Sequence, residues 1–185
     1  MSKVGNGPTR HAYMDESRRG ARYLLTASLI ASRDVAKVTK AVKESLPNGR
    51  RRAHFSDEGP KLRRRILDSY CRLPTTVAIA VAEYRGGDDQ AARNECFKAL
   101  LGAFVQLRVR VAVLDTRGPD RDAVDRRFIA QALREGHGPS DLQYSHRGSR
   151  DEPLLGLPDV FGWRYGAGGA WQEQVVPLLV AKLGA

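Results

Sequence analysis

The sequence predicts one α/β domain with a mixed sheet, in which an opening antiparallel hairpin is followed by alternating strands and helices. Apolar segments on both sides of Arg18–Gly20 predict the hairpin. Segments 75–83 and 108–114 are rich in β-branched residues, and a segment with helical spacing of apolar residues separates them. With 185 residues the chain is long enough for one domain with its own core.

The first half of the chain supplies the hairpin and two helices. We expect a flexible basic leader at residues 1–10, followed by a single domain at 11–185. Ser32 is a candidate N-cap for a helix that ends at Leu46, before Pro47-Asn48-Gly49. Ser56 or Asp57 can cap the next helix. The expected elements are strands at 11–15 and 23–30 and helices at 32–46 and 57–71.

The second half alternates between strands and helices. Residues 75–83 are almost wholly apolar, which is typical of a strand that is buried on both faces. The later helices have apolar residues three or four positions apart. The expected elements are strands at 75–83, 108–114 and 141–145 and helices at 88–106, 121–134, 154–163 and 171–182. This alternation favours a sheet with helices packed on it.

The charge is unevenly distributed along the chain. The formal net charge is +10, and residues 1–75 carry this whole excess, with 17 Lys and Arg against 7 Asp and Glu. A basic field of this kind attracts polyanions, so nucleic acid is the expected partner, and a merely solvated basic face is the alternative. The apolar fraction of 42% excludes a disordered chain. No apolar run reaches the ~20 residues of a membrane span, and Cys71 and Cys96 are expected to be free thiols of a cytoplasmic protein.

Three acidic residues from distant parts of the chain lie near the ends of expected elements. Asp15 ends the first strand, Asp115 follows the strand at 108–114, and Asp159 lies early in a late helix. Ligands of open α/β sheets gather at the carboxyl ends of the strands, and carboxylates suit hard divalent cations. The spacing therefore suggests a magnesium or manganese site, and helix capping is the alternative role of such acids.

Three segments resemble a bacterial family known as domain of unknown function 3800. They are Tyr13–Ser17 with the hairpin after it, Arg52–Ser56 before a helix, and Glu152–Trp163. The resemblance covers roughly residues 10–182. It implies a ribonuclease H-like fold and a metal-dependent nuclease.

The resemblance also implies roles for the acidic residues. Asp15 would be the metal ligand of the first strand and Asp159 the helical one, with Asp115 between them and Mg²⁺ or Mn²⁺ as the metal. The family usually reads Asp-Glu-Ser-Gly, whereas Arg18 and Arg19 separate that motif from its glycine here. These departures leave open a degenerate site.

Glu16 and two histidines are further candidates. Neighbouring side chains of a strand point to opposite faces, so Glu16 can share a site with Asp15 only if the strand ends or bulges there. Glu16 is therefore either a ligand or a turn residue. His54 and His146 lie in polar segments near strands, where each is a hydrogen-bonded structural residue or a group that shuttles a proton.

The strongest basic cluster lies between residues 50 and 65. Contacts of such a cluster with phosphate would position a nucleic-acid backbone without reading its sequence. A solvated helix face is the alternative. The members of the cluster are Arg50, Arg51, Arg52, Lys61, Arg63, Arg64 and Arg65.

The leading functional hypothesis is a divalent-metal-dependent nuclease that hydrolyses phosphodiester bonds of DNA or RNA. Asp15, Asp115 and Asp159 would hold the metal, and Glu16 and His54 are further catalytic candidates. One alternative is a catalytically degenerate protein that binds nucleic acid. Another is a protein–protein interaction module whose basic face meets an acidic partner. The sequence specifies neither the type of nucleic acid nor the oligomeric state.

Overall fold

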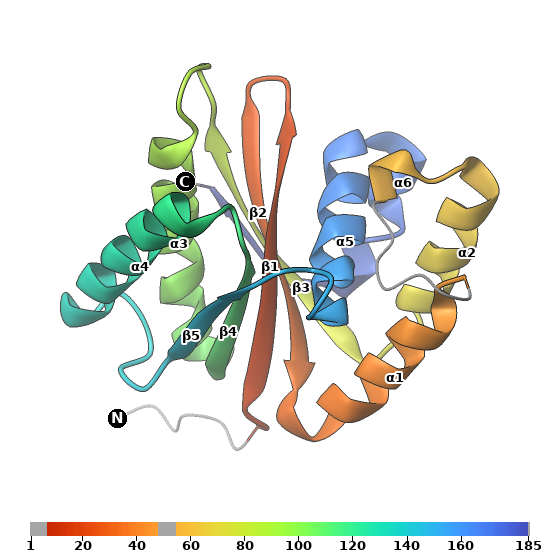
Figure 1. Ribbon diagram of the computed structural model, residues 1–185, viewed down its shortest axis with the longest axis horizontal. Coiled ribbons are helices and arrows are strands. Elements are labelled where there is room, and N and C mark those ends of the chain that lie inside the picture. The colour runs from red at the N-terminus through yellow and green to blue at the C-terminus, as the bar shows by residue number, and fades with distance from the viewer. Residues whose placement is uncertain (1–6, 48–54, 185) are drawn as a thin grey trace.

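The computed structural model describes residues 7–47 and 55–184, which form a six-stranded mixed sheet with helices on both faces (Figure 1). The strand order is β5-β4-β1-β2-β3-β6. Helices α3 and α4 cover one face, and α1, α2 and α5 cover the other (Figure 1). The strands are β1 (Arg10–Arg19), β2 (Arg22–Ala31), β3 (Thr75–Glu83), β4 (Val109–Asp115), β5 (Gln143–Arg147) and β6 (Leu179–Gly184). The helices are α1 (Val35–Ser45), α2 (Pro60–Tyr70), α3 (Gln90–Gln106), α4 (Pro119–Arg134), α5 (Gly156–Ala167) and α6 (Gly169–Glu173).

The hairpin of β1 and β2 is longer than the sequence pattern predicts. Its two strands pair antiparallel along their whole lengths, with Asp15 opposite Thr26. The prediction that Asp15 ends the first strand is therefore wrong, because Asp15 lies in the middle of β1. The polar residues that follow it stay in the strand because the backbone of the buried strand β2 needs hydrogen-bond partners on that side.

The other strands extend this hairpin on both sides. β3 pairs antiparallel with β2 and spans the predicted residues, whereas β4, β5 and β6 join through parallel pairs. The continuous helix predicted at 171–182 is wrong, because the α-helix Gly169–Glu173 is followed by a short 3-10 helix at Val176–Leu178 and by the edge strand Leu179–Gly184. Pro177 lies between the α-helix and the strand, and a proline inside a helix removes a backbone hydrogen bond.

The first two helices of the α1, α2 and α5 layer lie where the sequence predicts them, but their starts differ from the prediction. Ser32 does not cap α1, and its hydroxyl donates a hydrogen bond to the carbonyl of Thr9. Helix α2 begins at Pro60, later than the predicted caps Ser56 and Asp57. Proline is well suited to this position because the first helical N–H has no partner within the helix.

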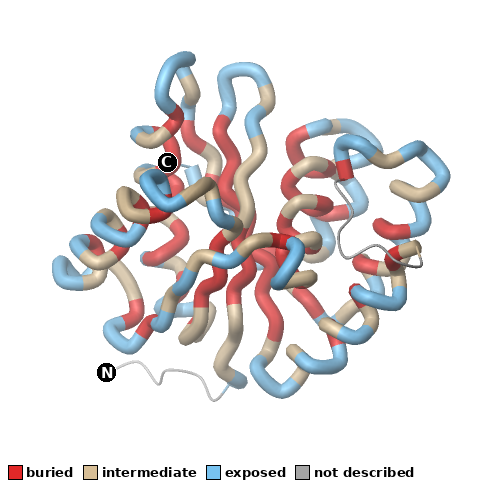
Figure 2. Tube along the Cα trace, in the orientation of Figure 1, coloured by how far each residue is buried: buried red, intermediate tan, exposed pale blue. Residues whose placement is uncertain are grey.

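Two apolar cores lie on the two faces of the sheet, and Figure 2 shows the buried strands between the half-buried helices. Tyr13 belongs to the core under α1, α2 and α5, whereas Met14 belongs to the core under α3 and α4. Alternate residues of β1 therefore face different helices. Within the described ranges, no helix combines the length and the apolar character that a membrane crossing requires.

Helix α5 packs closely against the hairpin through two glycines. A Cβ atom at Gly162 would lie 2.7 Å from the hydroxyl oxygen of Thr26, and one at Gly166 would lie 2.7 Å from Cγ of Arg19. Both distances are shorter than a normal contact, so only glycine lets the helix approach this far. This close approach holds the first turn of α5, which contains Asp159, against β1 and β2.

We expect Gly162→Ala to lower the free energy of unfolding by about 1–3 kcal/mol, because the added methyl group overpacks the contact with Thr26. The matched control is Gly102→Ala in α3, where the added methyl group meets open space. That control should stabilise the protein by about 0.5–1 kcal/mol, because glycine is a poor helix former. Urea unfolding of both variants checks the prediction. Equal free energies of unfolding for Gly162→Ala and Gly102→Ala would contradict the close approach of α5 to the hairpin.

Candidate active site

Asp15 and Asp115 lie on the face of the sheet that α5 covers. On the parallel strands β1 and β4, Tyr13 is paired with Val113, and both belong to the core on that face. Residues two positions later on each strand point the same way, so Asp15 and Asp115 are neighbours on this face. Asp115 is the last residue of β4, as predicted.

Asp159 reaches the same region from the first turn of α5. Its Oδ2 atom accepts a hydrogen bond of 3.1 Å from the backbone N–H of Phe55. A carboxylate in this turn also interacts favourably with the positive end of the helix dipole. The predicted position of Asp159, early in a late helix, is confirmed.

The charges of these acids influence one another. Burial raises the pKa of Asp15 well above its usual value. The negative charges of Glu16, Asp159 and Asp115 raise this pKa further, and a hydrogen bond of 2.8 Å from the backbone N–H of Glu16 opposes the rise. A site that gathers negative charge around a buried carboxyl group favours a bound proton or a cation.

Two observations test whether these residues suit a divalent cation. The hydroxyl oxygen of Thr26, opposite Asp15 in the hairpin, is buried and has no hydrogen-bond partner among the described residues. This unpaired oxygen and the carboxylates are the hard donors that Mg²⁺ and Mn²⁺ prefer. However, in the part of the chain that the structure describes, no three Asp, Glu, His or Cys side chains lie close enough together to hold an ion. The donor chemistry suits the metal, whereas the present side-chain positions do not form a complete metal site.

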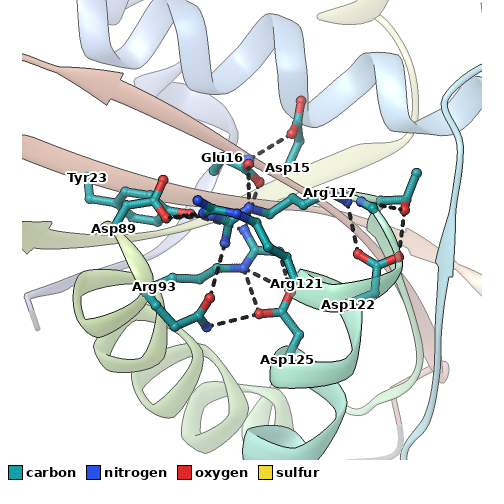
Figure 3. Close-up of polar contacts among 12 residues, drawn as sticks. Asp15, Glu16, Tyr23, Asp89, Arg93, Arg117, Arg121, Asp122 and Asp125 are labelled. Atoms are coloured by element: carbon teal, nitrogen blue, oxygen red, sulfur yellow. Dashed lines mark hydrogen bonds and ion pairs between the residues drawn. The ribbon is translucent and has the colours of Figure 1, made fainter. Parts of the chain in front are cut away.

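Glu16 points to the opposite face of the sheet and contacts two arginines (Figure 3). Its Oε2 atom lies 2.7 Å from Nη1 of Arg93, and its Oε1 atom lies 3.4 Å from Nε of Arg117. Glu16 is therefore an ion-pairing residue inside β1 and not the turn residue that was one of its two predicted roles. The predicted alternation of side chains between the faces explains why it does not join Asp15.

Arg93 is the centre of a buried network on this face. Its side chain is 1% exposed and forms two-pronged hydrogen bonds of 2.8 to 3.1 Å with the fully buried Asp125. Arg93 also donates a hydrogen bond of 3.0 Å to the hydroxyl of Tyr23. Its contacts with Glu16 and Asp125 connect β1 to α3 and α4 (Figure 3).

The network continues along α4 and β5. His146 lies near the rim of the network, with Nε2 at 3.3 Å from Oδ2 of Asp125. It therefore lies on the α4 side of the sheet, away from the face that carries Asp15 and Asp115. Asp122 accepts a hydrogen bond of 2.9 Å from the backbone N–H of Arg117, which fixes the loop after β4. These contacts support the structural role of His146.

Arg117 and Arg121 complete the network at its outer edge. Both guanidinium groups form ion pairs with Asp89, which precedes α3. The three arginines of this network are therefore all paired with acids of the same side.

The predicted basic cluster divides into three parts. Arg50, Arg51 and Arg52 lie outside the described residues, as does the catalytic candidate His54. Lys61, Arg64 and Arg65 are exposed on α2, as predicted. The prediction that Arg63 lies on the outer side of α2 is wrong, because its guanidinium is half-buried and donates hydrogen bonds to the carbonyl oxygens of Phe55 and Ser56.

Sequence reasoning missed the network residues Arg93, Arg117 and Asp125. An arginine within the apolar positions of α3 and an aspartate among the apolar positions of α4 are the signals that could have identified a buried pair. Periodicity alone gives no partner for either residue.

Comparisons with known proteins identify the fold. No family model matches the chain, and no curated protein matches it in sequence. The ribonuclease H2 from Pyrococcus horikoshii OT3 matches in structure with a TM-score of 0.56 and 12% sequence identity, over 92% of this chain and 75% of that chain. A second match is to the PCNA:RNase HII complex from Archaeoglobus fulgidus, with a TM-score of 0.45 and 10% identity, over 91% of this chain and 87% of that chain.

The protein therefore has a ribonuclease H-like α/β fold. The sequence pattern predicts the mixed sheet with helices, and the resemblance implies its ribonuclease H-like type. The resemblance to domain of unknown function 3800 stays an interpretation of the sequence motifs, because no family model supports it.

We expect Arg93→Met to lower the free energy of unfolding by roughly 3–5 kcal/mol, because it leaves the buried Asp125 and the half-buried Glu16 without their cation. Lys40→Met is the matched control, since Lys40 forms an exposed pair with Glu44 that contributes no more than about 0.5 kcal/mol. Chemical denaturation measures both values. A loss below ~1 kcal/mol in Arg93→Met would show that the buried pairs do not stabilise the fold.

Acidification should weaken the same network. Burial alone would raise the pKa of Asp125, but hydrogen bonds with His146, Arg93 and Gln90 and the charge of Arg93 lower this pKa to about 2. A lowered pKa means that Asp125 contributes stability above pH 4, and that this stability is lost as the pH falls towards 2.

The expected loss from Asp125 is about 2 kcal/mol between neutral pH and pH 2, to be measured by urea unfolding across this range. Asp125→Asn should be less stable at neutral pH and lose less stability on acidification. Asp141→Asn, which changes an exposed acid in the same way, should retain the loss seen in the wild type. A variant Asp125→Asn with an unchanged pH dependence would contradict the assignment.

Proposed function

We propose that the protein is a divalent-metal-dependent nuclease that hydrolyses phosphodiester bonds of a nucleic acid. One observation carries the proposal: Asp15, Asp115 and Asp159 come from distant segments, lie on the same side of the sheet, and interact electrostatically. The ribonuclease H-like fold supports it, because the structural match in Pyrococcus horikoshii is a ribonuclease H2.

Asp15, Asp115 and Asp159 would hold Mg²⁺ or Mn²⁺ in this proposal. A bound ion would activate a water molecule and neutralise charge on the phosphate group. The raised pKa of Asp15 means that its carboxyl group binds a proton readily, and a cation would displace that proton. Asp159 would keep its hydrogen bond from the N–H of Phe55, which holds one of its two carboxylate oxygens in place. Glu16 supplies no ligand here, because Arg93 and Arg117 hold it on the other face.

The substrate backbone would lie along the exposed bases of α2. Lys61, Arg64 and Arg65 are exposed on this helix, which belongs to the layer that also contains α5. Contacts of this kind bind phosphate without selecting a base sequence. Arg50–Arg52 and His54 keep their predicted roles in binding and proton transfer as part of this proposal. The two free thiols agree with the proposed cytoplasmic setting.

A protein that binds nucleic acid without cleaving it is the second candidate. In the described part of the chain the acidic side chains do not converge on one metal position, and this specific observation favours it. Binding that weakens steeply with salt but gives no cleavage with any divalent metal would identify this function.

The nuclease assay uses the purified full chain with DNA and RNA, in single-stranded and double-stranded form, and with Mg²⁺, Mn²⁺ or chelator. We expect cleavage that depends on the metal. Asp15→Asn, Asp115→Asn and Asp159→Asn should each reduce it by about 100-fold or more, because each removes several kcal/mol of charge stabilisation.

Asp141→Asn is the matched control, since it neutralises an exposed acid on the edge of the sheet and should leave cleavage unchanged. Cleavage that persists in Asp15→Asn, or in the presence of chelator, would exclude the proposed mechanism.

A further inference from the structure

Arg164 of α5 is a buried arginine that has no conventional partner among the residues that the structure describes. The residue is 0% exposed, and its Nε and Nη1 atoms have no hydrogen-bond acceptor among the described residues. No carboxylate in the described ranges forms an ion pair with it. A buried charge is costly unless it is paired and hydrogen-bonded, so this position calls for an explanation.

The surroundings of Arg164 are aromatic and basic. Its guanidinium lies 3.4 Å from the ring centre of Trp171 and 5.5 Å from that of Phe55. Burial lowers the pKa of Arg164 to about 10. The nearby Cys71 and Asp68 oppose this decrease, and the positive charges of Arg63 and Arg64 add to it. Contact with ring faces stabilises the cation, but it leaves the N–H donors in the guanidinium plane unsatisfied.

Trp171 covers the guanidinium from the surface of the protein, where its ring also packs edge-to-face against Trp163 with the ring centres 6.1 Å apart. It belongs to α6, a five-residue helix in which no residue is buried, and Trp171 itself is 37% exposed. Gly168 connects α5 to α6, and Gly169 is the first residue of α6; their φ angles are 72° and 56°. Glycine moves readily between such conformations and ordinary ones, so the cover can shift without disturbing the core.

We propose that Arg164, with Arg63 and Arg64 beside it, is a phosphate-binding site that Trp171 covers until α6 moves. A phosphate oxygen would accept hydrogen bonds from the unpaired N–H groups of Arg164, which a guanidinium offers in a planar fork. Arg63 and Arg64 outnumber Asp68, the acid whose charge also acts on Arg164, and this surplus of positive charge favours an anion. A phosphodiester of a nucleic-acid strand is the ligand that we favour over free phosphate, and this choice alone rests on the proposed function.

The binding test uses the full chain in a buffer with chelator and without divalent metal. Inorganic pyrophosphate and a short oligothymidylate are titrated separately, with calorimetry as the readout. We expect saturable binding that becomes at least about ten-fold weaker in Arg164→Met, because hydrogen bonds to a charged group are lost. Arg127→Met removes the same charge from an exposed position on α4 and should bind as the wild type does.

A second variant tests the cover without altering the arginine. We expect Trp171→Ala to bind pyrophosphate about three-fold or more tightly than the wild type does. Without the indole ring over Arg164, no free energy is needed to open the site before the ligand binds. This variant decides the question if circular dichroism shows that Arg164→Met does not fold.

The outcomes separate the site from the nuclease. Binding that requires Arg164 supports the site. If the oligothymidylate binds, the ligand is a nucleic-acid strand; if pyrophosphate alone binds, the ligand is free phosphate. Asp15→Asn should bind normally in the chelator buffer even if it abolishes cleavage. Wild-type affinity in a folded Arg164→Met variant, or no tighter binding in Trp171→Ala, would overturn the proposal.

Discussion

The buried ion pairs of Arg93 with Asp125 and Glu16 are the constraint on which the candidate site depends. Each charge would be expensive to bury alone, so the three residues stabilise the fold only as a unit. The unit fixes the position of β1 relative to α3 and α4. A shift of β1 by one residue would exchange the faces of Asp15 and Glu16, placing an acid in an apolar core and leaving Arg93 unpaired. The network on the α3 and α4 side therefore determines that Asp15, and not Glu16, points to the face that α5 covers.

The opposite face supplies the second constraint. Gly162 lets α5 approach the hairpin to a distance that no larger residue allows, and Asp159 lies one turn before it. The backbone N–H of Phe55 then binds the Asp159 carboxylate and orients it. Packing on this side brings a helical acid to two strand acids, while the pairing of Glu16 keeps a fourth acid away. Both layers of helices thus determine which acidic residues lie together at the candidate site.

Local patterns were sufficient to predict the parts of the fold that depend on neighbouring residues. The strand at 75–83 and the position of Asp115 at the end of β4 are as predicted. In both segments the apolar content and the length of the run, which are properties of the local sequence, determine burial and strand length. The end of β1 and the strand β6 were not predictable in the same way. The polar end of β1 is held in the sheet by its pairing with the buried strand β2, and β6 by its pairing with the distant strand β3, and both pairings override the local preference. The Arg93 network was missed for a related reason. Its contacts join residues that are 77 and 32 positions apart, and no periodicity in α3 marks the arginine as buried among acids.

The distribution of paired charges explains how a net charge of +10 can act on one side of the molecule. On the α3 and α4 side, Arg93, Arg117 and Arg121 are neutralised by acids of the same region. Lys61, Arg64 and Arg65 of α2 are exposed, and Arg164 of α5 has no hydrogen-bond partner for its Nε and Nη1 atoms among the described residues. The uncompensated positive field therefore belongs to the layer that also carries Asp159. A polyanion drawn to this layer would arrive beside the carboxylates, where a divalent cation would be needed to offset the repulsion between phosphate and Asp15.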